Sequence, residues 1–234
     1  KTTMMRCICG LLSPEKGSIE CDCENIGYLP QQFGAMKSLT VYETMRYFAT
    51  LKKIPKSNQD NEIRYCIDLV NLSDKIKNKV GSLSGGMVRR LGIAQAIMGN
   101  PEIVLFDEPT AGLDPEERVR FKSLLRKIKN DKTIIISTHI VSDVKSICDE
   151  IVIINEGRNV VQGTCSDITS IGNEKVFLLD EEYENNLEGN YYVKDRISKD
   201  NKNYIIVLSS NFIEQGVSIN ADIEDGYLCA LKDI

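Results

Sequence analysis

The stretch from Ile103 to Asp114, IVLFDEPTAGLD, constrains the fold more than any other part of this chain. Its first four residues are apolar, as in a short strand that is buried on both faces. Two adjacent carboxylates follow, Asp107 and Glu108. Open α/β sheets bind ligands at the carboxyl ends of their parallel strands. The stretch therefore predicts an α/β fold in which one acid holds a hard cation and the other polarises water, although a strand followed by a solvated acidic turn would also explain it.

Composition and charge narrow the class of protein. The hydrophobic share of 42% and the charged share of 27% are ordinary for a soluble globular chain. The net charge of −5 argues against nucleic acid as the main partner. No apolar run approaches the ~18 residues that a membrane-spanning helix needs. The chain is therefore expected to be soluble and to reach a membrane only by docking on a membrane protein.

Eight cysteines raise the question of disulfides or zinc. They include two C-x-C pairs but no C-x-x-C, and the only histidine is distant. The pair Cys7 and Cys9 lies in a stretch with helical periodicity, Met4 to Leu12, where residues two apart point about 200° apart and cannot share a metal. Reduced, scattered cysteines, as in a cytosolic protein, explain the pattern better.

Three further segments present groups that suit phosphates or a metal. Lys1–Thr3 heads the first predicted helix and matches the end of the phosphate-loop pattern G-x-x-x-x-G-K-[ST]. Ser84–Gly86 precedes a helical pattern from Val88 to Met98, with a capping serine and two glycines that allow close approach. Gln31 follows a short apolar strand and offers a carbonyl oxygen. Taken singly, these are a chance tripeptide, a flexible turn and a polar loop residue.

Local signals place the remaining elements. Thr40 and Glu43 have the spacing of a capping box, which predicts a helix from Val41 to about Leu51. Strands are predicted at Ile26–Leu29 and in TIIISTH, which ends at His139. Further along, the sequence predicts a hairpin over 149–161 and short strands at 173–179, 191–193 and 204–208, with polar separators around 180–184 and 198–203.

Taken in order, these motifs resemble those of the ATPase subunits of ATP-binding-cassette (ABC) transporters. The resemblance covers roughly Lys1 to Thr164 and is most specific in LSGGM…RRLGIAQAI and LFDEPT. Met87 stands where many members have Gln, a variant that is familiar in exporters. Six elements carry the resemblance: the tail of a Walker A motif (Lys1–Thr3), a Q-loop (Gln31), the signature (Leu83–Met87), a Walker B motif with its glutamate (Ile103–Glu108), a D-loop (Ala111–Asp114) and a switch histidine (His139).

The resemblance implies ATP and Mg²⁺ as ligands and assigns a role to each matching residue. Lys1 would hold the β- and γ-phosphates, Glu108 would act as general base or orient the attacking water, and His139 would contact the γ-phosphate. Gln31 would sense the metal and water. The implied ATP-binding residues are Lys1, Thr2, Thr3, Ser84, Gly85, Gly86 and Asp114, and the implied Mg²⁺ residues are Thr2, Gln31 and Asp107.

The resemblance also implies partners. Ser84, Gly85 and Gly86 would close on ATP held by a second ATPase subunit, in a head-to-tail homodimer with two-fold symmetry. Asp114 would lie at that interface or cap the next helix, since Pro115 fits its first position. Integral-membrane permease subunits would complete an exporter on the cytoplasmic face of the cell membrane. The alternatives are a non-transport ABC ATPase, which would need tandem cassettes or coiled-coil arms, and a degenerate ATP-binding module.

The expected architecture is an α/β P-loop ABC ATPase core with a mainly parallel sheet. Residues 1–164 would form that domain without its N-terminal strands, with a helical subdomain inserted at 33–98. Residues 165–234 would form a small α+β appendage. The resemblance places the glycine-rich half of the phosphate loop and the adenine-stacking aromatic residue before Lys1. The 234 residues alone are therefore expected to bind ATP poorly and to hydrolyse it negligibly.

Overall fold

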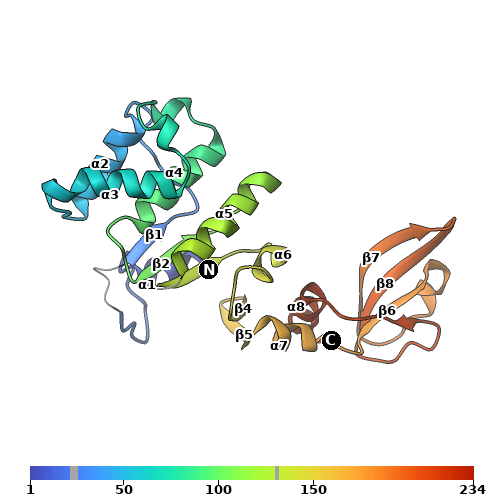
Figure 1. Cartoon of the computed structure of the whole chain (residues 1–234). Helices are drawn as coiled ribbons and strands as arrows, with labels where there is room; N and C mark the ends of the chain where they lie inside the picture. Colours follow the sequence, from blue (N-terminus) through green and yellow to red (C-terminus); the bar gives the residue numbers. More distant parts are fainter. Residues whose placement is uncertain (22–25, 130–131) are drawn as a thin grey trace. The chain divides into compact units, whose positions relative to one another are not determined.

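The computed structural model describes residues 1–21, 26–129 and 132–234 (Figure 1). The chain divides into two compact units, residues 1–139 and 140–234. This division does not coincide with the domain boundary predicted after Thr164. The hairpin and helix on either side of Thr164 share a small core with the last helix, so they belong to one compact unit. The functional boundary at 164/165 stays a prediction.

The sheet of the first unit is parallel, as predicted. It contains β1 (Ile26–Leu29), β2 (Ile103–Asp107) and β3 (Thr133–Ser137) in the order β1-β2-β3. Val104, Leu105 and Phe106 are buried completely, which confirms a central strand covered on both faces. The register pairs Phe106 with Leu29 and Ile136, so the three strands end at the same edge. The residues that follow β2 and β3 are therefore brought together there.

The helical block inserted between β1 and β2 positions the signature segment. It contains α2 (Val41–Leu51), α3 (Lys56–Leu69) and α4 (Gly85–Ile97), with short 3-10 segments at Ser73–Lys75 and Val80–Ser82. Figure 1 shows the three helices grouped together. The predicted capping box of Thr40 and Glu43 is present. Helix α4 contacts β1 closely, because a Cβ at Gly27 would lie 2.1 Å from the carbonyl oxygen of Ala96. Glycine is required at that crossing.

Two more helices flank the sheet. Helix α1 (Thr2–Ile8) is shorter than the predicted stretch to Leu12. It ends there because Gly10 adopts φ +69° and the N–H groups of Gly10 and Leu11 bond back to the last turn, which closes the helix. Helix α5 (Pro115–Ile128) begins at its predicted cap, Asp114, whose Oδ1 accepts from the N–H of Glu117 at 2.8 Å.

The second unit is α+β, and its large sheet is antiparallel. Its strands run β7-β8-β6-β9, which are Tyr191–Lys199, Lys202–Ser209, Val176–Asp180 and Val217–Ser218. The predicted hairpin is β4 (Ile151–Asn155) and β5 (Arg158–Gly163). Three helices complete the unit: α6 (Val141–Val144), α7 (Cys165–Ser170) and α8 (Ile223–Lys232).

The two polar stretches predicted to separate strands in this unit do so, although the strand bounds differ from those predicted. The stretch 198–203 contains the two-residue turn between β7 and β8, at Asp200 and Asn201, both with positive φ; the two strands extend further into the stretch than predicted. The acidic run, 180–184, begins at the end of β6 and lies before β7. It forms the 3-10 segment Glu181–Asn186, and Arg196 of β7 pairs with Glu181 at 2.5 Å and Glu184 at 2.7 Å. Opposite charges therefore hold this segment to the sheet.

Candidate active site

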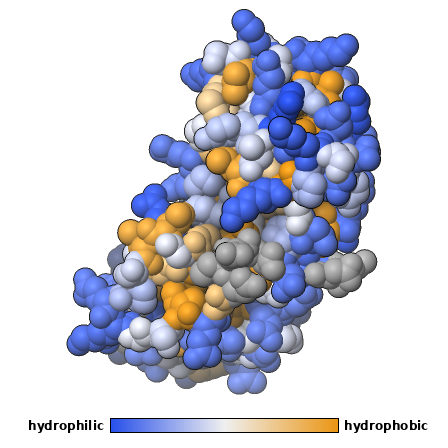
Figure 2. All heavy atoms as spheres, turned by 90° about the vertical axis from the view of Figure 1, so that its left-hand side faces the viewer, coloured by the Kyte–Doolittle hydropathy of each residue, from blue (hydrophilic) through white to orange (hydrophobic). Residues whose placement is uncertain are grey.

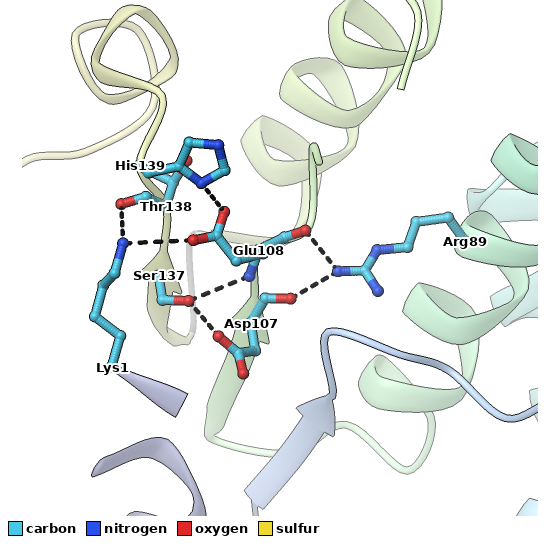
Figure 3. Close-up of polar contacts among 7 residues, drawn as sticks. All are labelled: Lys1, Arg89, Asp107, Glu108, Ser137, Thr138 and His139. Atoms are coloured by element: carbon cyan, nitrogen blue, oxygen red, sulfur yellow. Dashed lines mark hydrogen bonds and ion pairs between the residues drawn. The ribbon is translucent and has the colours of Figure 1, made fainter. Parts of the chain in front are cut away.

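The edge where β2 and β3 end gathers four of the predicted residues (Figure 3). The register places Asp107 of β2 opposite Ser137 of β3, and His139 follows two residues later. Glu108 comes directly after β2, and Lys1 reaches the same edge from the N-cap of α1. Segments far apart in the sequence therefore present a lysine, two carboxylates and an imidazole to one place.

The surroundings of Asp107 suit a metal ligand. Its side chain is completely buried, and its Oδ1 accepts a hydrogen bond from the hydroxyl of Ser137. Among the residues that the structure describes, its Oδ2 has no hydrogen-bond partner. Leaving a buried carboxylate oxygen unpartnered is costly. A hard divalent cation such as Mg²⁺ binds carboxylate oxygens directly or through water, so this residue fits the metal that the motifs imply.

Glu108 is held in a strained backbone conformation. Its φ is +50°, a left-handed value that costs energy for a residue with a side chain. Its N–H donates to the carbonyl oxygen of Ser137 at 3.0 Å and to the hydroxyl of Ser137 at 3.2 Å. These bonds fix the peptide, and the turn aims the carboxylate away from the strand, toward Lys1 and His139.

Both oxygens of the Glu108 carboxylate have partners. Oε2 lies 2.8 Å from Nδ1 of His139, and Oε1 lies 3.4 Å from Nζ of Lys1. Lys1 also donates to the carbonyl oxygen of Thr138 at 2.8 Å. The side chain of Glu108 is 10% exposed, whereas that of His139 is 66% exposed. The carboxylate is thus buried and oriented, while the imidazole lies at the surface where a ligand could reach it.

The remaining predicted residues lie on other segments. Ser84 caps α4, accepting from the N–H of Met87 at 3.2 Å; Gly85 is exposed, and a Cβ added to it would meet no atom within 4 Å. Gln31 follows β1, and its main-chain carbonyl oxygen accepts a hydrogen bond from Nη1 of Arg89 at 3.0 Å. Thr2 and Thr3 lie in the first turn of α1. Asp114 is a helix cap, which accounts for one of its two predicted uses; its role at a subunit interface stays a prediction.

Sequence reasoning missed two residues, Ser137 and Arg89. Ser137 could have been found from strand register, because it ends β3 directly opposite Asp107. Arg89 lies one helical turn before Ile93 on the buried face of α4, so an arginine on an apolar face was the available signal. Burial lowers the pKa of the Arg89 guanidinium, and the charges of Asp107 and Glu108 oppose that shift. Its positive charge therefore lies within reach of both carboxylates.

The fold and this edge define an α/β protein of the phosphate-binding ATPase class. A sequence model of the family described as "ABC transporter" matches residues 1–111. The uncharacterized ABC transporter ATP-binding protein YxlF of Bacillus subtilis is 30% identical over 95% of this chain and 77% of its own length. The chain belongs to the ATP-binding proteins of ABC transporters.

For other relatives, this chain matches only part of a longer protein. The methionine import ATP-binding protein MetN of Corynebacterium efficiens is 34% identical over 73% of this chain, which spans 52% of that protein. ABC transporter A family member 1 of Dictyostelium discoideum is 34% identical, and the chain spans 21% of it. A solved structure of an ATP-binding subunit of an ABC transporter aligns with a TM-score of 0.65 at 25% identity, covering 73% of this chain and 76% of that one. This confirms the predicted fold class.

Proposed function

We propose that this chain forms the catalytic part of an ABC transporter, where ATP hydrolysis drives export through separate membrane subunits. The observation that carries the proposal is the buried Asp107, whose Oδ2 has no partner among the described residues, beside the oriented carboxylate of Glu108. A metal-holding acid next to a water-orienting acid is what phosphoryl transfer requires, because that reaction depends mainly on positioning and charge neutralisation.

Asp107 would hold Mg²⁺ together with the hydroxyl of Thr2 and the side-chain oxygen of Gln31. The ion would neutralise charge on the phosphate oxygens when bound. Burial of Asp107 supports this role, because a dry carboxylate attracts a cation more strongly than a solvated one. Ser137 would keep Oδ1 occupied, so that Oδ2 faces the ion.

Glu108 would accept a proton from the attacking water or orient it. Its contact with Nδ1 of His139 supports a shared task, in which His139 holds the carboxylate and touches the γ-phosphate. Lys1 contacts Glu108 at 3.4 Å. With ATP bound, its ammonium group would move to the phosphates, and the oxygen of Glu108 that it leaves would become available to water.

A second ATPase subunit would complete the site. Ser84, Gly85 and Gly86 lie at the N-terminus of α4, where exposed N–H groups attract anions. We propose that they close on ATP held by the partner, as does Asp114, in a head-to-tail homodimer.

Membrane subunits would then dock on the helical block. Figure 2 shows a mainly hydrophilic face with apolar side chains in separate patches, and exposed Tyr47, Leu51 and Tyr65 lie on α2 and α3.

Export is supported by the Met87 variant of the signature and by the GLDP sequence ending at Pro115. One relative, MetN, is named as an import protein, so import is the second candidate direction. Over the described parts of the chain, no helix is long and apolar enough to cross a bilayer. We propose that permease subunits carry the path for the cargo and that this chain acts at the cytoplasmic face of the membrane.

The proposal is tested by the Mg²⁺ dependence of nucleotide binding. ATP affinity is measured by titration calorimetry with and without Mg²⁺, in the protein containing this chain, for the wild type, Asp107→Asn and the exposed control Asp74→Asn. We expect Mg²⁺ to strengthen ATP binding in the wild type and control but not in Asp107→Asn, by on the order of tenfold or more. Equal Mg²⁺ dependence in all three would remove the assigned metal role.

A further inference from the structure

All of the N–H groups of the Arg89 side chain, on α4, donate hydrogen bonds to main-chain oxygens beside the site. A guanidinium has five N–H donors, and the structure gives five bonds. Nε donates to Pro109 at 3.2 Å, Nη1 donates to Pro30 at 2.9 Å and Gln31 at 3.0 Å, and Nη2 donates to Asp107 at 2.7 Å and Glu108 at 2.8 Å. All five acceptors are carbonyl oxygens. The residue is only 9% exposed.

These oxygens belong to two segments at the carboxyl edge of the sheet. Pro30 and Gln31 follow β1, and the other acceptors lie at the end of β2 and just beyond it. The two strands are neighbours, so one planar group spans the gap between the loops that leave them. A guanidinium fixes the relative position of several acceptors because its donors form a rigid fork. The loop bearing Gln31 is thus tied to the loop bearing Glu108.

The bond to Glu108 has a specific consequence. With φ at +50°, Glu108 needs its surroundings to hold its backbone. Ser137 binds its N–H, and Arg89 binds its C=O (Figure 3). The residue is therefore anchored on both sides. No bond between the guanidinium and the side-chain oxygens of Glu108 or Asp107 exists within the described parts of the chain, so the positive charge offsets burial of the acids without occupying their oxygens.

We propose that Arg89 is a positioning residue for hydrolysis. It holds Glu108 in its left-handed conformation, keeps the carboxylate aimed at Lys1 and His139, and sets the distance from that carboxylate to the Gln31 loop. The inference rests on the proposed function only in assigning Glu108 to the attacking water. Lysine cannot replace Arg89, because one ammonium group has three donors at a single point and would leave at least two of these carbonyls unpartnered.

The chain contains its own reporter for this proposal. His139 is the only histidine and contacts Glu108 directly, so its ring resonances in NMR spectra respond to the position of the carboxylate. Spectra are compared for the wild type, Arg89→Lys, Arg89→Met and Glu108→Gln, without nucleotide. Arg90→Lys is the matched control, because Arg90 is the adjacent arginine but bonds the carbonyls of Val70 and Asn71.

We expect the Arg89 variants to move the His139 resonances toward those of Glu108→Gln, and Arg90→Lys to leave them near the wild type. Unchanged resonances in a folded Arg89 variant would overturn the proposal, and so would an equal displacement in Arg90→Lys. Failure of both Arg89 variants to fold would also overturn it, because Arg89 would then support the whole unit. Melting curves establish which variants fold.

A kinetic arm uses the protein assembled with its membrane subunits. Arg89→Lys should lower kcat for ATP hydrolysis by about tenfold or more while KM stays within about twofold, because nucleotide contacts remain and only the water-orienting geometry is lost. A rise in KM with unchanged kcat would contradict the proposal. If the wild type hydrolyses no ATP, the proposed function fails, whereas the His139 spectra still decide whether Arg89 positions Glu108.

Discussion

Two mostly buried cations, Arg89 in the first unit and Lys194 in the second, have different kinds of partner. Among the described residues of the first unit, Arg89 donates only to main-chain carbonyl oxygens, and Lys52 donates to those of Ala96 and Met98. In the second unit, Lys194 pairs with carboxylates, the shortest contact being 2.6 Å to Asp225. In such a buried pair each charge is the partner of the other, and removing one of them leaves an uncompensated charge. Arg89 instead leaves the side-chain oxygens of Asp107 and Glu108 to other groups: Glu108 contacts Lys1 and His139, and Oδ2 of Asp107 has no partner among the described residues.

The largest expected effect is on ATP hydrolysis, and it tests the proposed role of the Glu108 carboxylate in that reaction. Glu108→Gln keeps the shape of the side chain but removes its charge and its ability to accept a proton. We expect ATP hydrolysis in the assembled transporter to fall by on the order of 100-fold or more, with ATP still bound and the ATP-bound dimer accumulating. Hydrolysis is measured by phosphate release from the assembled transporter, and dimerisation by light scattering on the ATPase subunit without its membrane partners.

The exposed Glu116→Gln on α5 serves as the control for this substitution and should behave as the wild type. A Glu108→Gln protein that stays monomeric with ATP, while the wild type hydrolyses it, would contradict the shared two-subunit site. Loss of ATP binding in Glu108→Gln would instead show that the carboxylate supports the nucleotide and not the water.

A matched pair of substitutions sharpens the comparison through stability. Asp225→Asn should destabilise the second unit by about 2 kcal/mol, because it weakens the buried pair with Lys194. Asp107→Asn should leave the first unit as stable as before or slightly more so, because the wild-type Oδ2 has no partner among the described residues. Urea unfolding, followed by NMR signals from each unit, measures both. If Asp107→Asn lowered the free energy of unfolding of its unit more than Asp225→Asn lowers that of the second unit, Asp107 would be a stabilising residue and not one kept for a ligand.

Local chemistry explains which parts of the fold could be predicted. Three helix starts could be predicted from their capping residues, Thr40, Ser84 and Asp114. Each of these residues caps its helix as predicted, because capping depends on residues within one turn. The apolar run before Asp107 forms the predicted strand because its signal, a short run of apolar residues, is also local in sequence. Arg89 and Ser137 escaped prediction because their roles arise from contacts between segments distant in sequence. Such contacts require the order and register of the strands, which no local pattern specifies.

The smallest expected effect concerns pH. Burial lowers the pKa of Lys52 to about 8, below its usual 10.5, so between these values the unfolded chain binds more protons than the folded one. The free energy of unfolding of the first unit should therefore rise with pH above about 8. Burial raises the pKa of the nearby Cys66 thiol, so an opposing loss of stability begins above its usual value of 9.0. A net rise of less than about 1 kcal/mol is expected from pH 8 to 9.

The second unit should show no such rise. Although burial lowers the pKa of Lys194, its hydrogen bond and charge attraction to Asp225 outweigh burial, and the pKa lies above its usual value. Lys194 therefore stays charged in both states between pH 8 and 9, and its contribution is lost only as the pH rises through that higher folded pKa. Urea unfolding at several pH values, with Lys52→Met as the comparison, tests the difference. The substitution should abolish the rise in the first unit, because an uncharged side chain at this position releases no proton on folding; a rise that persists in Lys52→Met would assign it to another group.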